Sequence, residues 1–202
     1  RALESPVVAK ALQLSSPGIG EEGCQRIERV LGIKLPLSYR RVVKNYDLSN
    51  LEMNMLSFGP GSLGYEFDMV EWLIKNNSPE MPLSELYAQE GLLEVATLET
   101  APICIRTTGE RSGEVVWFDP EHEPPPYKIQ FAASDFESLI IGTAIVEKME
   151  RDSDFRKWAS EHWRDANYWQ QANELAEQVV AAIAEVDPRA WEAKEFWYSL
   201  VG

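Results

Sequence analysis

The first third of the chain shows the three-to-four-residue hydrophobic spacing of amphipathic helices. The stretch CQRIERVLGIKLP predicts a short helix that presents Ile27, Val30 and Leu31 and ends at Gly32. The next stretch, LPLSYRRVVKNYD, has apolar residues at i, i+3, i+4 and i+7 from Tyr39, which predicts a second helix. After an alternating NLEMNML stretch and a glycine-rich turn, YEFDMVEWLIKNN again has helical spacing.

From residue 92 onward the hydrophobic period shortens to two. The stretches LLEVATL, APICIRT and EVVWFDP predict strands, with the polar TTGERSG as a turn before the third. Alternation places Val115 and Trp117 on one face of that third strand and Val116 and Phe118 on the other. Successive short strands with tight turns favour an antiparallel sheet.

The next stretch alternates once more and then turns helical. In YKIQF the alternation predicts a strand with Tyr127, Ile129 and Phe131 on one face. The tetrapeptide SDFE, Ser134 to Glu137, matches a capping box that opens another helix. The expected fold class is therefore α+β, a mostly antiparallel sheet flanked by helices and followed by a helical C-terminal extension.

The last fifty residues carry an apolar stripe from Phe155 to Val186 that includes Trp158 and Trp169. This spacing predicts one long helix, or two helices broken near Asn167, before a final short helix that follows an Asp-Pro step. A stripe of this kind aggregates if it is left exposed, so we expect it to be buried on the sheet domain or on a second copy of the chain.

Charge divides the chain into regions of opposite sign. The net charge is −14 over 202 residues; residues 26–44 carry six basic groups against one acid, and residues 45–127 carry fifteen acids against three basic groups. An acidic field repels nucleic acid and membranes and attracts basic partners. Solubility alone is the competing explanation of the acidic excess.

Three features of the sequence bear on the cellular compartment of the protein: its apolar runs, its first residue and its cysteines. No apolar run approaches the ~20 residues of a membrane-spanning helix, and because the chain begins at Arg1 the loss of a leader segment stays open. The cysteines Cys24 and Cys104 lie far apart, and Cys104 lies within the apolar PICI, as a buried free thiol does. We therefore expect a cytoplasmic protein.

The densest cluster of reactive side chains is the turn with Asp119, Glu121, His122 and Glu123. Neighbours on an extended chain point in opposite directions, so at most two of them could share a metal ion. The other histidine, His162, lies on the apolar stripe, where a structural role is the expectation. No nucleophile motif or zinc-ligand pattern is present, and we expect no cofactor, no metal and no catalytic activity.

The order of these motifs resembles the SUKH superfamily, which contains immunity proteins and cell-wall-regulator-like domains. The resemblance spans residues 22–146 and is carried by a Leu35-Pro36 step before a helix with Tyr39, by the turn and strand at 113–115, and by the helix entry at 133–136. It implies a bacterial protein that binds and neutralises a toxin, commonly a nuclease, and it transfers no catalytic residues. The expected units are an N-terminal segment, 1–21, a SUKH-like domain, 22–146, and a helical extension, 147–202.

Three functional hypotheses remain at this point: a toxin-binding immunity protein, a scaffold or regulator on the same fold, and a metal-dependent enzyme that uses the acidic turn. For the first, a basic toxin domain would dock on Asp119, Glu121 and Glu123, with Trp72 and Trp117 as candidate anchors; the alternative for both tryptophans is a place in the core. A homodimer through the C-terminal helices is a further expectation.

Overall fold

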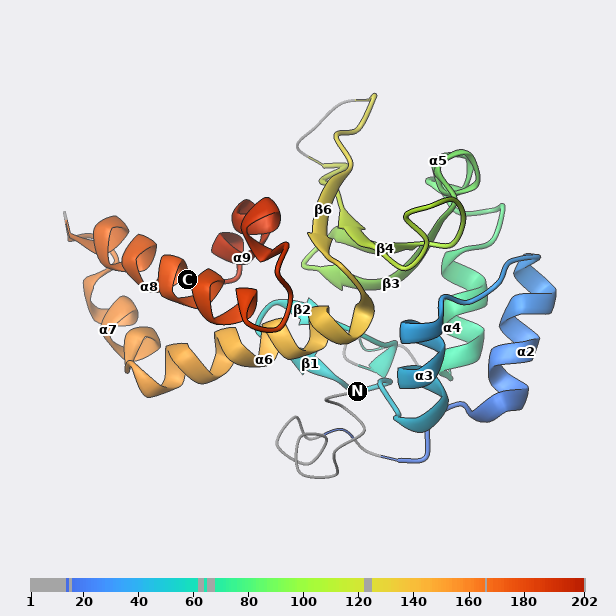
Figure 1. Ribbon diagram of the computed structural model, residues 1–202, viewed down its shortest axis with the longest axis horizontal. Coiled ribbons are helices and arrows are strands. Elements are labelled where there is room, and N and C mark those ends of the chain that lie inside the picture. The colour runs from blue at the N-terminus through green and yellow to red at the C-terminus, as the bar shows by residue number, and fades with distance from the viewer. Residues whose placement is uncertain are drawn as a thin grey trace.

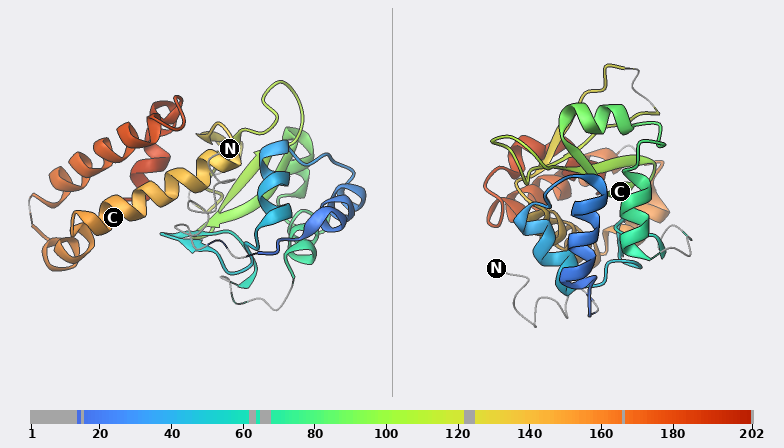
Figure 2. Two further views of the ribbon diagram at one scale, coloured as in Figure 1. Left: turned by 60° about the horizontal axis from the view of Figure 1, so that its bottom comes forward. Right: turned by 90° about the vertical axis from the view of Figure 1, so that its right-hand side faces the viewer.

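The computed structural model describes residues 14, 16–61, 64, 68–121, 125–165 and 167–201. An antiparallel sheet lies between N-terminal helices at one end of the molecule and C-terminal helices at the other (Figure 1). Figure 2 shows the C-terminal helices extending away from the sheet on the side opposite the N-terminal helices. The α+β class predicted from the sequence is confirmed.

The sheet has six strands in the order in which they occur along the chain, and every neighbouring pair is antiparallel. The strands are β1 (Glu52–Met53), β2 (Leu56–Ser57), β3 (Leu92–Leu98), β4 (Ala101–Arg106), β5 (Val115–Trp117) and β6 (Gln130–Ala133). β3 and β4 lie at the centre of the sheet. Because both of their faces are buried, their sequences alternate little between apolar and polar residues.

The helices α2 (Gly20–Leu31), α3 (Leu37–Asn45) and α4 (Met69–Asn76) contribute to the main core on one face of the sheet. Gly32 ends α2 in the left-handed conformation, φ 67°, as the sequence predicts. Val30, however, is 57% exposed. The prediction that it faces the core is wrong, because the buried face of α2 is centred on Cys24 and Ile27.

The opposite face of the sheet is covered by α5 (Ser84–Glu90), which the hydrophobic pattern did not reveal. Only Tyr87 of α5 is buried, so the helix has no repeating apolar signal. It packs with Cys104, Val116 and Phe118 in a second, smaller core. Since Val115 belongs to the main core and Trp117 packs against it, the two faces predicted for β5 are confirmed.

One face assignment is wrong. Tyr127 and Ile129 pack on the smaller core, whereas Phe131 packs against the main core on the other side of the sheet. Strand β6 begins only at Gln130, and its pairing with β5 shifts register between Val115 and Val116, so simple alternation does not extend across the stretch.

The helix α6 (Phe136–Asp152) begins one residue later than the capping box predicts. Its N-cap is Asp135, whose carboxylate accepts a hydrogen bond from the Ser138 backbone N–H at 2.8 Å. Ser134 instead donates its backbone N–H and its hydroxyl to the buried Asp187, both at 2.7 Å. The predicted cap residue therefore links the sheet to the C-terminal segment.

The C-terminal segment contains α7 (Phe155–His162), α8 (Tyr168–Ala184), the 3-10 turn η2 (Ala190–Ala193) and α9 (Lys194–Ser199). The break near Asn167 is confirmed. α8 packs on α6, and η2 and α9 pack on β6. Along the predicted stripe, Trp169 and Val186 are exposed, so the stripe is not buried throughout.

The units expected from the sequence, 1–21, 22–146 and 147–202, can be compared with the helices and strands of the structure. The boundary between residues 146 and 147 lies within α6, which runs unbroken across it. Of the N-terminal segment 1–21, residues 1–13 and 15 lie outside the described residues.

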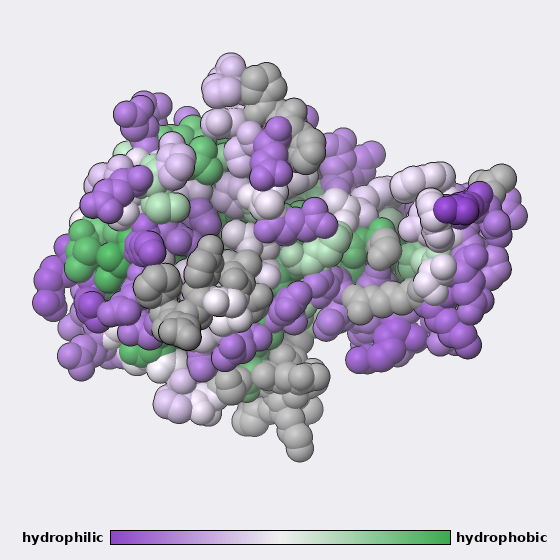
Figure 3. All heavy atoms as spheres, turned by 180° about the vertical axis from the view of Figure 1, so that it is seen from behind, coloured by the Kyte–Doolittle hydropathy of each residue, from purple (hydrophilic) through white to green (hydrophobic). Residues whose placement is uncertain are grey.

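Seen from behind, the C-terminal helices are mostly hydrophilic, and hydrophobic residues gather most visibly at the end that holds α2 and α4 (Figure 3). No helix among the described residues is long and apolar enough to cross a membrane.

Candidate functional site

The acidic turn begins directly after β5, where Phe118 leaves the sheet. The Asp119 carboxylate accepts a hydrogen bond from the Glu121 backbone N–H at 3.0 Å, which shapes the turn and leaves the Glu121 side chain exposed. His122 and Glu123 lie outside the described residues.

Aromatic contacts place this turn on the same side of the sheet as α5. The Phe118 ring lies 6.5 Å from the Tyr87 ring of α5 and 5.5 Å from the Tyr127 ring, centroid to centroid. The same side carries carboxylates on and beside α5 and in the turn, of which Glu80, Glu85 and Glu121 are exposed and Asp119 is half-buried. We call the group Glu80, Glu85, Asp119 and Glu121 the acidic layer.

The acidic layer has few internal cations to neutralise it. Glu80, Glu85 and Glu121 form no ion pair within the part of the chain that the structure describes. Arg106, the basic residue of β4, lies 3.6 Å from Glu90 and 4.0 Å from Glu114, so its charge is directed to other carboxylates. Unpaired surface carboxylates attract a basic partner without first having to break ion pairs.

The two candidate anchor tryptophans have different environments. Trp72 is 1% exposed in the main core, so it cannot contact a partner, and its assignment as an anchor is wrong. It occupies an inward position of α4, next to the buried Leu73. Trp117 is half-buried, with its ring 5.8 Å from the Phe196 ring.

Two tryptophans are exposed near the connection between α7 and α8: Trp163 follows α7, and Trp169, which the sequence predicts to be buried in the apolar stripe, is the second residue of α8. Trp163 is 58% exposed and Trp169 is 71% exposed. Behind them, the Trp158 ring stacks on the His162 and Tyr168 rings at 5.2 and 5.9 Å. We call Trp163 and Trp169 the indole corner. Spacing alone could not find it, because tryptophan counts as apolar wherever a helix places it.

His162 is accounted for within this stack. Its Nδ1 lies 2.8 Å from the Trp158 carbonyl oxygen, one helical turn away, and its ring covers the Trp158 ring. These contacts give the histidine a structural role. Among the described residues no group of three or more histidine, cysteine, aspartate or glutamate side chains could hold a metal ion.

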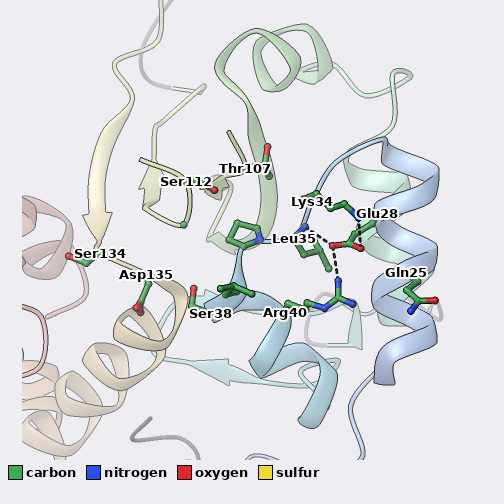
Figure 4. A pocket seen from close by; sticks show the side chains of 13 residues that line it. Gln25, Glu28, Lys34, Leu35, Ser38, Arg40, Thr107, Ser112, Ser134 and Asp135 are labelled. Atoms are coloured by element: carbon green, nitrogen blue, oxygen red, sulfur yellow. Dashed lines mark hydrogen bonds and ion pairs between the residues drawn. The ribbon is translucent and has the colours of Figure 1, made fainter. Parts of the chain in front are cut away.

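A cavity of about 1000 Å³ opens between α2, α3 and the β4–β5 connection (Figure 4). On its α2 wall the Glu28 carboxylate accepts hydrogen bonds from Arg40 at 2.7 Å and from the Leu35 backbone N–H at 3.0 Å. Burial opposes ionisation of Glu28, but these hydrogen bonds outweigh it and lower its pKa. Glu28 is therefore an ionised carboxylate whose charge Arg40 already neutralises.

Several groups with raised pKa values lie in or beside the smaller core. The Tyr87 hydroxyl donates to the Glu94 carboxylate at 2.5 Å, and burial raises the pKa of Glu94. Burial also raises the pKa of the Cys104 thiol well above its ordinary value, and Cys24 shifts in the same direction for the same reason. Both cysteines are buried and free, as the sequence predicts for Cys104, and protonated thiols are poor nucleophiles.

Comparison with known proteins gives one family match. The model of a family described as SUKH-4 immunity protein matches residues 80–202. The matched range begins before α5 and includes β3 to β6, α6 and the whole C-terminal segment. No curated protein and no solved structure matches the chain.

Proposed function

The chain belongs to the SUKH-4 immunity protein family, and from this membership we propose that it binds a cognate toxin domain one to one and thereby neutralises it. The family match carries the proposal, because it covers most of the chain and includes both α5 and the acidic turn. We propose that the protein acts as a stoichiometric inhibitor and not as an enzyme, in the bacterial cytoplasm.

The proposed docking surface is the acidic layer together with Glu123. Its negative charge favours a basic toxin domain, such as a nuclease whose own site must hold phosphate groups. Attraction between opposite charges speeds the encounter of the two proteins, and the acidic layer would also cover the cationic site once they have met.

Of the two anchors suggested by the sequence, only Trp117 remains in the proposal. The ring is half-buried against Phe196 on the main-core face of β5, opposite the face that carries α5, so it would contact a part of the partner that extends beyond the acidic layer. A rigid, partly exposed aromatic side chain has the properties of a binding hot spot.

The C-terminal helices support a second proposed contact, a homodimer. The indole corner places two large apolar side chains in solvent at the far end of the C-terminal helices. Burying them against a second copy of the chain would remove that apolar surface from water. This contact is separate from the acidic layer and does not compete with toxin binding.

Two alternatives make different predictions. A scaffold or regulator on the same fold would have no toxin encoded beside it. A metal-dependent enzyme that uses Asp119 and Glu121 would retain a stoichiometric metal ion through purification.

Co-expression tests the proposed function. The neighbouring open reading frames are searched for a large secreted protein with a C-terminal toxin domain, and that domain is expressed with and without this protein. We expect the cells to survive only with both, and a one-to-one complex to be purified. Cell death at the rate seen with the toxin domain alone, with no complex recovered, would refute the immunity function.

A further inference from the structure

Three cavities along α2 form one continuous groove. The cavity of about 1000 Å³ shares Glu28 and Lys34 with a second cavity of about 620 Å³, which in turn shares Ile33 and Thr108 with a third of about 570 Å³. Thr107 lines all three. We call this the α2 groove. It lies between α2 and the start of α3 on one side and the β4–β5 connection and α5 on the other (Figure 4).

Both ends of the α2 groove offer apolar surface. At the α5 end, Val30, Leu31 and Ile33 face Tyr87 and Leu92 across the third cavity. Val30 is 57% exposed there, because it lies outside the buried face of α2 that Cys24 and Ile27 form.

The opposite end exposes a second apolar side chain. Leu37, at the first position of α3, is 85% exposed and lines the largest cavity beside Pro36. An extended segment that follows the groove could therefore bury apolar side chains at both ends.

The middle of the α2 groove is basic. Arg29 and Lys34 line the second cavity together with Glu28, whose charge is already neutralised by Arg40. Lys34 is 87% exposed at 3.6 Å from Glu28, and Arg29 forms no ion pair within the described part of the chain.

Apart from Glu28 in the middle, the acids that line the groove lie towards its ends. Glu85 lines the α5 end, and Asp135 lines the other end, where its carboxylate caps α6. The centre therefore carries a positive charge that is opposite in sign to the acidic layer.

From this pattern we infer that the α2 groove binds an extended acidic segment of a partner protein, with apolar side chains at its ends and carboxylates at Arg29 and Lys34. Charge complementarity selects the acidic segment, because Arg29 forms no ion pair within the described residues and Lys34, at 3.6 Å from Glu28, shares that carboxylate with Arg40. Binding here would be a second activity, on a surface that shares only Glu85 with the acidic layer.

Two peptides and the intact protein test the inference. A capped hexapeptide that alternates leucine with aspartate is titrated into isotopically labelled protein, and the same peptide with lysine in place of aspartate is the control. We expect saturable amide shifts at Gly32, Thr107 and Gly113, which lie along the groove, with the acidic peptide only.

Matched variants separate a groove site from general charge attraction. Arg29→Glu with Lys34→Glu should weaken the acidic peptide at least about tenfold. Lys157→Glu with Lys194→Glu, the same change in net charge at exposed positions on the C-terminal helices, should leave its affinity unchanged. Val30→Ser should also weaken it, because the apolar end would be lost.

The inference is wrong if the two peptides bind alike, if shifts gather away from the groove, or if both charge-reversed variants lose affinity equally. Toxin protection by the Arg29→Glu, Lys34→Glu variant is measured in parallel. We expect it to be retained, so a failure of this inference and a failure of the proposed function give different results.

Discussion

Trp72 and Trp117 show how the surroundings of a residue decide its role. Both are tryptophans within the acidic part of the chain, and the sequence gives both the same candidate role as anchors. In the structure the Trp72 ring is enclosed in the main core, whereas Trp117 is half-buried against Phe196. Their truncation should therefore affect different properties.

We expect Trp72→Ala to lower the free energy of unfolding by about 3–5 kcal/mol, because it leaves a large cavity in the main core. Trp117→Ala should cost less stability and, on the proposed function, should weaken toxin binding. Urea unfolding and a binding assay on both variants check this. A Trp72→Ala protein as stable as the parent would contradict the burial described here.

The two thiols give a second residue-scale prediction. Cys24 and Cys104 are buried, and burial raises the pKa of each, so neither supplies a thiolate near neutral pH. With a colourimetric disulfide reagent at pH 7 to 8, we expect almost no reaction of the native protein and two thiols per chain after denaturation. Rapid reaction of one thiol in the native protein would show that its site opens.

At the scale of elements, the hydrophobic period predicted the helices and strands that bury several side chains on one face. It did not predict an element that buries a single side chain. The helices α2, α3 and α4 and the strands β3 to β5 follow from spacing, because several side chains in each face the same core. α5 buries only Tyr87, so the hydrophobic period does not predict it, and β6 was predicted as a strand but starts three residues after the alternation begins.

The candidate site was predictable only in part, for the same reason. The acidic turn follows a strand whose faces are clear from the sequence. The grouping of the acidic turn with the carboxylates on and beside α5 depends on contacts between segments far apart in the chain. The same holds for the α2 groove and for the hydrogen bonds between Ser134 and Asp187.

Asp187 tests whether the C-terminal segment is part of the main folding unit. Its carboxylate accepts two hydrogen bonds from Ser134 and one from the Arg189 backbone N–H at 3.1 Å. We propose that Asp187→Ala lowers the free energy of unfolding by about 2–4 kcal/mol, because it leaves buried donors unpaired. Asp165→Ala, at an exposed position, should change it little.

Unfolding curves followed by tryptophan fluorescence and by circular dichroism should coincide for both aspartate variants. Two separate transitions would show instead that residues 147–202 unfold as an independent module.

The indole corner gives a prediction about assembly. Trp163→Gln with Trp169→Gln removes two exposed rings, so it should leave the free energy of unfolding nearly unchanged and shift any dimer towards monomer. Sedimentation velocity over a range of protein concentrations measures this. A dimer that persists unchanged in the double variant would place the self-contact elsewhere.

At the scale of the whole molecule, charge is distributed unevenly over the structure. The chain has a net charge of −14, yet α2 presents exposed cations beside the groove while the acidic layer lies on the α5 side of the sheet. A protein of this kind can present surfaces of opposite sign to different partners. The proposed function places toxin binding on the acidic layer.

Two variants isolate the contribution of the acidic layer. Asp119→Lys with Glu121→Lys reverses charge at the turn, and Glu174→Lys with Glu177→Lys makes the same change in net charge on exposed positions of α8. The first pair should act on toxin association and the second should not, because electrostatic steering depends on where the charge lies relative to the interface.

The most direct measurement is the association rate of the purified toxin domain with the parent protein and these two variants, by stopped flow at low and high salt. We predict that the turn variant associates about tenfold more slowly than the parent at low salt, and that the difference shrinks as salt shortens the screening length below ~10 Å. The α8 variant should match the parent. Equal rates for parent and turn variant at low salt, or an equal loss in both variants, would contradict docking on the acidic layer.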